Sequence, residues 1–254
     1  MSQSFAIFRH NVRLLIGDPG PVVLFIITPL LMMAIMRPAV GFVLVRLGYP
    51  DANGAEQVVP GFAAMFTFFW MPWVGRVFIA EHGWGTWERL RTAQVTSLGI
   101  LMGKIMPAMV IVTSQIILLF VIGALVFDLH SEGPVLALLL IPIPLMLAAM
   151  AITLALVGVL TTLSAIDAAG NLATMVFASL GGSLVPVAAL PDLAEKISPI
   201  TPNHWVMEAS SKVLLEGEGV GAVIGPALAL MGFAVVFGAI AALTFRVADA
   251  KVAT

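Results

Sequence analysis

Residues 102–126 read MGKIMPAMVIVTSQIILLFVIGALV, and Lys104 is the one charged side chain among them. A helix needs about 20 mainly apolar residues to cross the roughly 30 Å of hydrocarbon in a bilayer. This stretch is long enough and apolar enough, so it predicts a membrane-spanning helix.

Five further stretches of similar length and polarity predict an all-α integral membrane protein with six spans. Hydrophobic residues make up 60% of the 254 positions and charged residues 10%, whereas a soluble domain usually has about 25% charged residues. Lipid is therefore the solvent for most of the chain. No internal repeat divides it, so we expect one membrane domain over residues 1–254. The predicted spans are 21–45, 58–79, 102–126, 134–162, 168–189 and 221–245.

Prolines modify two of these spans. Arg37-Pro38 interrupts the first, whose membrane-embedded part is then expected to stop near Met36, with the remainder to Val45 re-entrant or interfacial. Pro142 and Pro144 predict a kink or a tilt in the fourth span.

The distribution of basic residues predicts that both termini are cytoplasmic in a multi-pass protein of the cell membrane. Lysine and arginine concentrate on the cytoplasmic side of membrane proteins. With the N-terminus inside, eight of the 12 basic residues lie on the inner side and most acidic loop residues lie outside. The four outer basic residues would be Arg37, Arg46, Lys196 and Lys212.

Three segments outside the spans have amphipathic patterns. Residues 1–17 predict a helix on the inner membrane surface, because Phe5, Phe8 and Val12 recur at helical spacing between polar residues. Residues 81–98 join spans two and three on the cytoplasmic side. Residues 191–219 form the longest loop, which is predicted to be extracellular, with an amphipathic or re-entrant part.

The sequence lacks the patterns of an enzyme. There is no cysteine, and the four histidines are scattered without metal-ligand spacing, so no metal site is expected. The run Gly99-Ile-Leu-Met-Gly103-Lys104 has one residue too few for a phosphate-binding loop, and Ile105 replaces the magnesium-binding serine or threonine. We therefore expect a chain that does not hydrolyse ATP by itself.

Charge is also scarce within the spans. The centres of spans three to six contain no Asp, Glu, Lys, Arg or His. Ion-coupled carriers usually place such groups at mid-membrane, because coupling needs a titrating or ion-binding side chain there. The energy for any transport must then come from elsewhere, or the protein is a passive conduit.

Two loops resemble those of a known family. The pattern Glu81…Gly85-Thr86-Trp87-Glu88-Arg89-Leu90, followed by Gly103-Lys104, resembles the coupling-helix region of ABC-2 type permeases, the six-span subunits of type V ABC exporters. The outer segment Leu190-Pro191-Asp192-Leu193…Pro199-Ile200-Thr201-Pro202…Trp205 is similar to the loop between that family's last two spans.

The resemblance implies a cytoplasmic coupling helix at about 82–92 that docks onto a separate ATPase subunit. That subunit would be present in two copies and would carry the ATP and Mg²⁺, while this chain would hold no cofactor. The implied coupling residues are Glu81, Gly85, Thr86, Glu88, Arg89 and Arg91. The alternative is that this amphipathic segment rests on the lipid surface through Trp84 and Trp87.

The resemblance also implies pairing with a second permease, identical or homologous. The translocation path would lie between the two, along parts of spans one, two and five. Candidate path residues are Phe62, Phe66, Phe69, Met175 and Phe177. The alternative for each is lipid contact or helix packing.

The short loops, and the lack of a fused ATPase or large outer domain, are most similar to drug and antibiotic exporters of the daunorubicin-resistance type. The expected substrates are amphiphilic small molecules. The alternatives are a lipid or polysaccharide exporter of the same family and, from another class, an ion-coupled carrier or channel that works without an ATPase.

Overall fold

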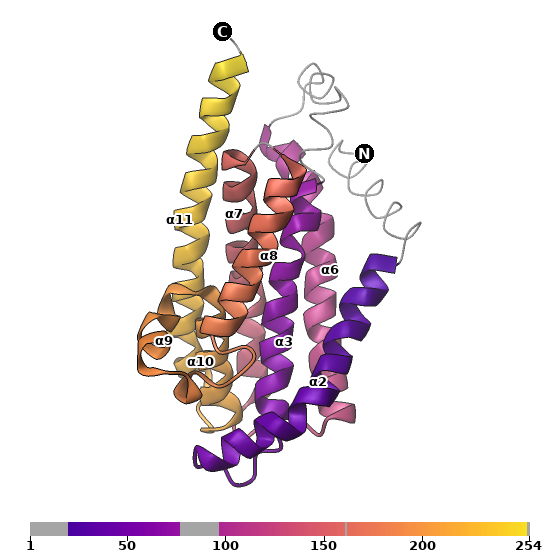
Figure 1. Cartoon of the computed structure of the whole chain (residues 1–254), viewed down its shortest axis with the longest axis vertical. Coiled ribbons are helices and arrows are strands. Elements are labelled where there is room, and N and C mark those ends of the chain that lie inside the picture. Colours follow the sequence, from indigo (N-terminus) through magenta and orange to yellow (C-terminus); the bar gives the residue numbers. More distant parts are fainter. Residues whose placement is uncertain (1–19, 77–96, 161, 253–254) are drawn as a thin grey trace.

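A computed structural model describes residues 20–76, 97–160 and 162–252 (Figure 1). This part of the chain is helical and contains no strand. Helices suit a chain in lipid because they satisfy their backbone hydrogen bonds internally. The elements are α2 (Gly20–Arg46), α3 (Ala55–Phe69), α6 (Ser97–Val126), η1 (Val135–Leu140), α7 (Pro142–Val159), α8 (Leu163–Leu180), η2 (Val187–Ala189), α9 (Asp192–Ile197), η3 (Ser198–Ile200), α10 (Pro202–Leu214) and α11 (Val220–Val252).

Six segments among the described residues are long and apolar enough to cross a membrane, which confirms the predicted number of spans. They are Val23–Arg46, Ala55–Arg76, Ala108–Val126, Val135–Val159, Leu163–Leu180 and Val220–Thr244. The segments alternate in direction, so that α2 begins and α11 finishes at the same end of the bundle (Figure 1). We call this the terminal end. The loop end is the opposite one, which carries residues 47–54, 127–134 and 181–219.

The second span is the central helix of the bundle. In its most apolar window 89% of the residues are buried, against 17% in the first and sixth spans. It contacts α2, α6, α8 and α10. Phe68 and Trp70 are fully buried, so the large aromatic side chains of this span form the middle of the core.

A buried polar network ties three spans together. The Trp70 indole Nε1 donates to Gln115 Oε1 of α6 at 2.7 Å, and Gln115 Nε2 donates to the backbone carbonyl of Phe25 in α2 at 3.0 Å. The Phe25 and Trp70 rings also pack at 4.7 Å between centroids. Because both polar side chains find partners, the amide of Gln115 is tolerated inside an apolar span.

The helix of the first span does not end at Arg37-Pro38. α2 continues through Pro29 and Pro38 to Arg46, and whether its membrane-embedded part stops near Met36 stays a prediction. A proline inside a helix removes one backbone hydrogen bond and crowds the preceding turn, which can bend the helix without ending it. The last turns of α2 slant across the loop end in Figure 1.

The fourth and fifth spans also depart from their predicted bounds. Span four begins as the 3₁₀ helix η1 and becomes α7 at Pro142, where the predicted break lies. Span five was expected at 168–189, but α8 starts at Leu163, where Thr162 accepts a hydrogen bond from Ala165 N at 3.2 Å. It ends at Leu180, because Gly181 and Gly182, the latter with a φ of +83°, turn the chain away.

Gly61 of α3 lies directly against the backbone of this turn, and a Cβ at that position would overlap the carbonyl of Ser183. We predict that Gly61→Ala destabilises the protein by about 1–3 kcal/mol, because backbone atoms must shift to make room. Thermal unfolding in detergent measures the effect. Gly232→Ala is the matched control, since nothing lies within 4 Å of the Cβ position there. Equal melting temperatures for the two variants would contradict the prediction.

Candidate functional site

The residues predicted to couple to an ATPase lie outside the described part of the chain. This holds for Glu81, Gly85, Thr86, Glu88, Arg89 and Arg91, and for the predicted surface helix at 1–17. Their roles stay predictions. The structure does describe both flanks of the coupling segment, which are Arg76 and Ser97, at the terminal end (Figure 1).

Arg76 joins the end of the second span to the start of α8. Its Nε donates to Asp167 Oδ1 at 3.1 Å and its Nη2 to Asp167 Oδ2, which makes the pair bidentate. The Arg76 side chain is 59% exposed, so the pair contributes little to stability. The pair nevertheless connects the end of the second span, just before the coupling segment, to α8.

The three predicted path residues of span two lie at different depths. Phe62 and Phe66 are 3% and 5% exposed and belong to the main core. Phe69 is partly buried, and its ring lies 5.2 Å from that of Phe66. Within this single chain, Phe62 and Phe66 are therefore packed in the core.

Of the two candidates on α8, Phe177 packs against the same core and Met175 does not. Phe177 packs against Phe68, with ring centroids 5.2 Å apart, and Met175 is 50% exposed on the outside of the bundle. Met175 is thus the most accessible of the five predicted path residues. Whether any of them lines a path stays a prediction.

The loop end is organised by α10. Pro202 occupies its first turn, and Thr201 Oγ1 accepts from His204 N at 3.4 Å as the N-cap. One face of the helix is buried against α3 and α11. The other carries His204, Glu208 and Lys212, which are four residues apart and therefore neighbours on one face.

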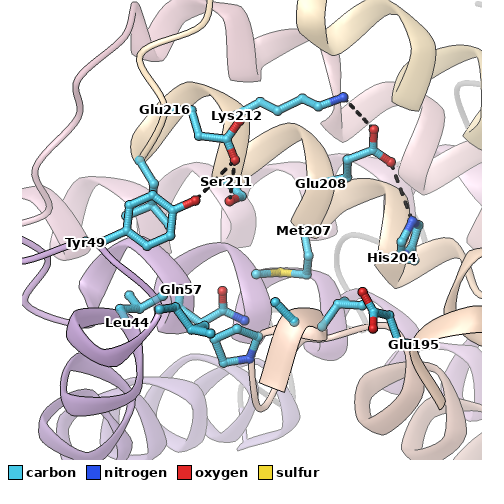
Figure 2. Close-up of a pocket in the computed structure, with 15 residues that line it drawn as sticks. Leu44, Tyr49, Gln57, Glu195, His204, Met207, Glu208, Ser211, Lys212 and Glu216 are labelled. Atoms are coloured by element: carbon cyan, nitrogen blue, oxygen red, sulfur yellow. Dashed lines mark hydrogen bonds and ion pairs between the residues drawn. The ribbon is translucent and has the colours of Figure 1, made fainter. Parts of the chain in front are cut away.

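A pocket of about 330 Å³ opens beside this face (Figure 2). Its apolar side includes Leu44 of α2 and Met207 of α10, and Gln57 reaches it from the start of α3. Three carboxylates, those of Glu195, Glu208 and Glu216, and the single ammonium group of Lys212 complete its charged lining. A lining that combines apolar side chains with an excess of carboxylates suits an amphiphilic molecule.

The polar side chains of this pocket are held in place by one another. Lys212 Nζ lies 2.6 Å from Glu208 Oε1, and His204 Nε2 lies 3.5 Å from Glu208 Oε2. The other ring nitrogen of His204, Nδ1, is 2.7 Å from Ser198 Oγ. Figure 2 shows the contacts of Glu208 with Lys212 and His204 along α10.

These contacts also set the protonation states. Burial lowers the pKa of His204, and Glu208 opposes that effect only in part. The hydrogen bond to Glu208 raises the pKa of Lys212. Burial and the neighbouring Glu216, whose Oε1 accepts from Tyr49 Oη at 3.4 Å, raise the pKa of Tyr49. At neutral pH His204 is therefore neutral while Lys212 is charged and Tyr49 protonated.

Analysis of the sequence did not single out this pocket, and it treated His204 as one of four scattered histidines. The spacing of His204, Glu208 and Lys212 was the available signal, because four-residue steps place side chains on one helix face. The contact of Tyr49 with Glu216 had no such signal, since 167 positions separate the two residues.

Comparison with known proteins identifies a family and a curated relative. Residues 2–215 match the family described as ABC-2 type transporter. The linearmycin resistance permease protein LnrN of Bacillus subtilis (strain 168) is 23% identical over 186 residues, which cover 73% of this chain and 48% of that protein. The aligned part therefore spans about half the length of this curated relative.

We predict that acidification loosens α10 through His204. Because burial lowers the pKa of His204 below its ordinary value of 6.5, the unfolded segment binds the proton more readily. The stability that His204 contributes is complete above pH 6.5 and is lost as the pH falls from there toward the lowered pKa. Hydrogen exchange of residues 202–214 at pH 7.5 and 5.5, corrected for intrinsic rates, measures the loss.

His204→Gln should remove most of this pH response, because glutamine does not titrate. His130→Gln is the control, since the His130 side chain is 64% exposed and should leave the response unchanged. A full pH response in His204→Gln would assign the effect to another group.

Proposed function

The chain belongs to the ABC-2 type transporter family, and we propose that it is the membrane permease subunit of an ATP-driven exporter of amphiphilic small molecules, drugs and antibiotics among them. The observation that carries this proposal is the family match over residues 2–215, on a chain with six candidate spans. A relative named for linearmycin resistance supports an antibiotic as the cargo.

The energy source would be a separate ATPase. The sequence has no complete phosphate-binding loop, which supports ATP and Mg²⁺ being bound by a partner subunit rather than by this chain. We propose two ATPase copies and a second permease, identical or homologous. The bias of lysine and arginine supports a cytoplasmic position for the terminal end.

The described contacts suggest how motion at the ATPase would reach the opposite side. A push on the coupling segment at 82–92 would act on Arg76, and through Asp167 it would also act on α8. The second span is packed along its length, and at the loop end it touches α10. Movement of this span would therefore change the shape of the pocket beside α10. This pocket would be an extracellular binding site for the amphiphile as it leaves the transporter.

We predict that Glu88→Lys uncouples the transporter. The charge reversal should weaken docking to the ATPase, so that transport falls at least tenfold while the chain stays inserted. Substrate efflux and ATP hydrolysis in proteoliposomes that contain the co-purified subunits measure both activities. Glu218→Lys, an exposed change at the loop end, is the control and should transport normally. Transport at the wild-type rate by Glu88→Lys would contradict the proposed role of Glu88 in coupling.

A mild-detergent pull-down from native membranes tests the partners. We expect a stoichiometric ATP-binding subunit that is lost when residues 81–91 are scrambled. The proposal fails if no ATPase co-purifies and the chain alone conducts or exchanges solutes in liposomes. That result would favour a channel or an ion-coupled carrier.

A further inference from the structure

We propose that Arg37, held by Asn53, binds the phosphate group of a membrane phospholipid. The site is a groove of about 440 Å³ between α2 and the end of α6. It is lined by Ala34, Arg37, Pro38, Asn53, Val126 and Phe127. This inference does not rest on the exporter function.

The depth of Arg37 in the bilayer follows from the length of the second span. Ala55–Arg76 contains 22 residues and is therefore about 33 Å long, which matches the roughly 30 Å of hydrocarbon. Its first residue then lies at the boundary between hydrocarbon and headgroups. Gly54, the residue before this span, lies directly against the backbone carbonyl of Arg37. Arg37 is therefore level with the lipid phosphates.

Asn53 fixes the guanidinium at this level. Its Oδ1 accepts from Arg37 Nε at 3.2 Å and from Ala55 N at 2.9 Å, while its Nδ2 donates to the carbonyl of Asp128 at 2.6 Å. The amide thereby connects α2, the start of α3 and the loop after α6. Arg37 is oriented before any ligand arrives, which lowers the entropic cost of binding.

The charge of Arg37 lacks a counter-ion in the described part of the chain. No carboxylate there lies within 4.0 Å of its guanidinium, whereas Arg76 and Lys212 each have an acidic partner. An arginine at the edge of the hydrocarbon can reach the headgroup region, where the lipid phosphates are the available anions. Its two terminal nitrogens can receive two oxygens of one phosphate, which is the geometry that guanidinium groups favour.

The surroundings of the groove favour a lipid over a soluble anion. Ile35 next to it is 73% exposed, and Leu125 and Val126 are 80% and 65% exposed. Acyl chains can cover these side chains while the phosphate meets Arg37. A free phosphate ester would leave the apolar surface uncovered.

Native mass spectrometry of the full chain, purified with whatever subunits accompany it, tests the proposal. The probes are phosphatidylglycerol and a diacylglycerol with the same acyl chains, which lacks the phosphate. We expect the tightest phosphatidylglycerol site to weaken at least tenfold in Arg37→Gln, and diacylglycerol to bind weakly to both proteins. Arg46→Gln is the matched control, because Arg46 lies on the same helix and stacks on Phe42 at 4.4 Å instead of facing the groove.

Unchanged phosphatidylglycerol affinity in Arg37→Gln would overturn the assignment. Equal binding of glycerol 3-phosphate and phosphatidylglycerol would also overturn it, because the groove would then be a soluble anion site. If Arg37→Gln does not fold, Arg37→Lys replaces it: the charge is kept but the paired donors are lost. Several-fold weaker lipid binding is expected there, and unchanged binding again counts against the site.

Discussion

Every polar group that this chain carries into the hydrocarbon must find its partner within the protein, because lipid offers none. The second span shows the consequence most clearly, since it is the most buried of the six. Its indole at Trp70 reaches Gln115, and the hydroxyl of Thr67 bonds to the carbonyl of Ala63 in its own helix at 2.8 Å. The bond from Trp70 to Gln115 therefore adds a polar contact between the second and third spans to their apolar packing.

Buried polar side chains also organise the loop end. Glu56 and Gln57 are buried at the start of α3, where Glu56 Oε2 accepts from Gly54 N at 3.0 Å and Gln57 Nε2 donates to the carbonyl of Gly182. Asn203 in turn donates to Ser183 Oγ at 2.7 Å, so the turn after α8 is held from two sides. The start of the central helix thus anchors the loop that carries α10 and its pocket.

The sequence predicted the six spans because each is a long apolar run, a feature that depends only on local composition. It failed at 168–189, because the apolar residues Leu184, Val185 and Val187 extended the run past a turn that Gly181 and Gly182 impose. The pairing of Arg76 with Asp167 was not predicted, since 91 positions separate the two residues and nothing local marks the contact. The coupling residues were predicted from resemblance alone, and they lie in 77–96, which the structure does not describe.

The network of Phe25, Trp70 and Gln115 also bears on biosynthesis. The chain is made from its N-terminus, and both partners of Gln115 precede it in the sequence. When the third span leaves the ribosome, the donor of Trp70 and the carbonyl of Phe25 have already been synthesised and can pair with Gln115. The first three spans can therefore assemble in the bilayer first. The last three spans can then pack against them. Because of this order, the amide of Gln115 need not face lipid without a hydrogen-bond partner while the later spans are being made.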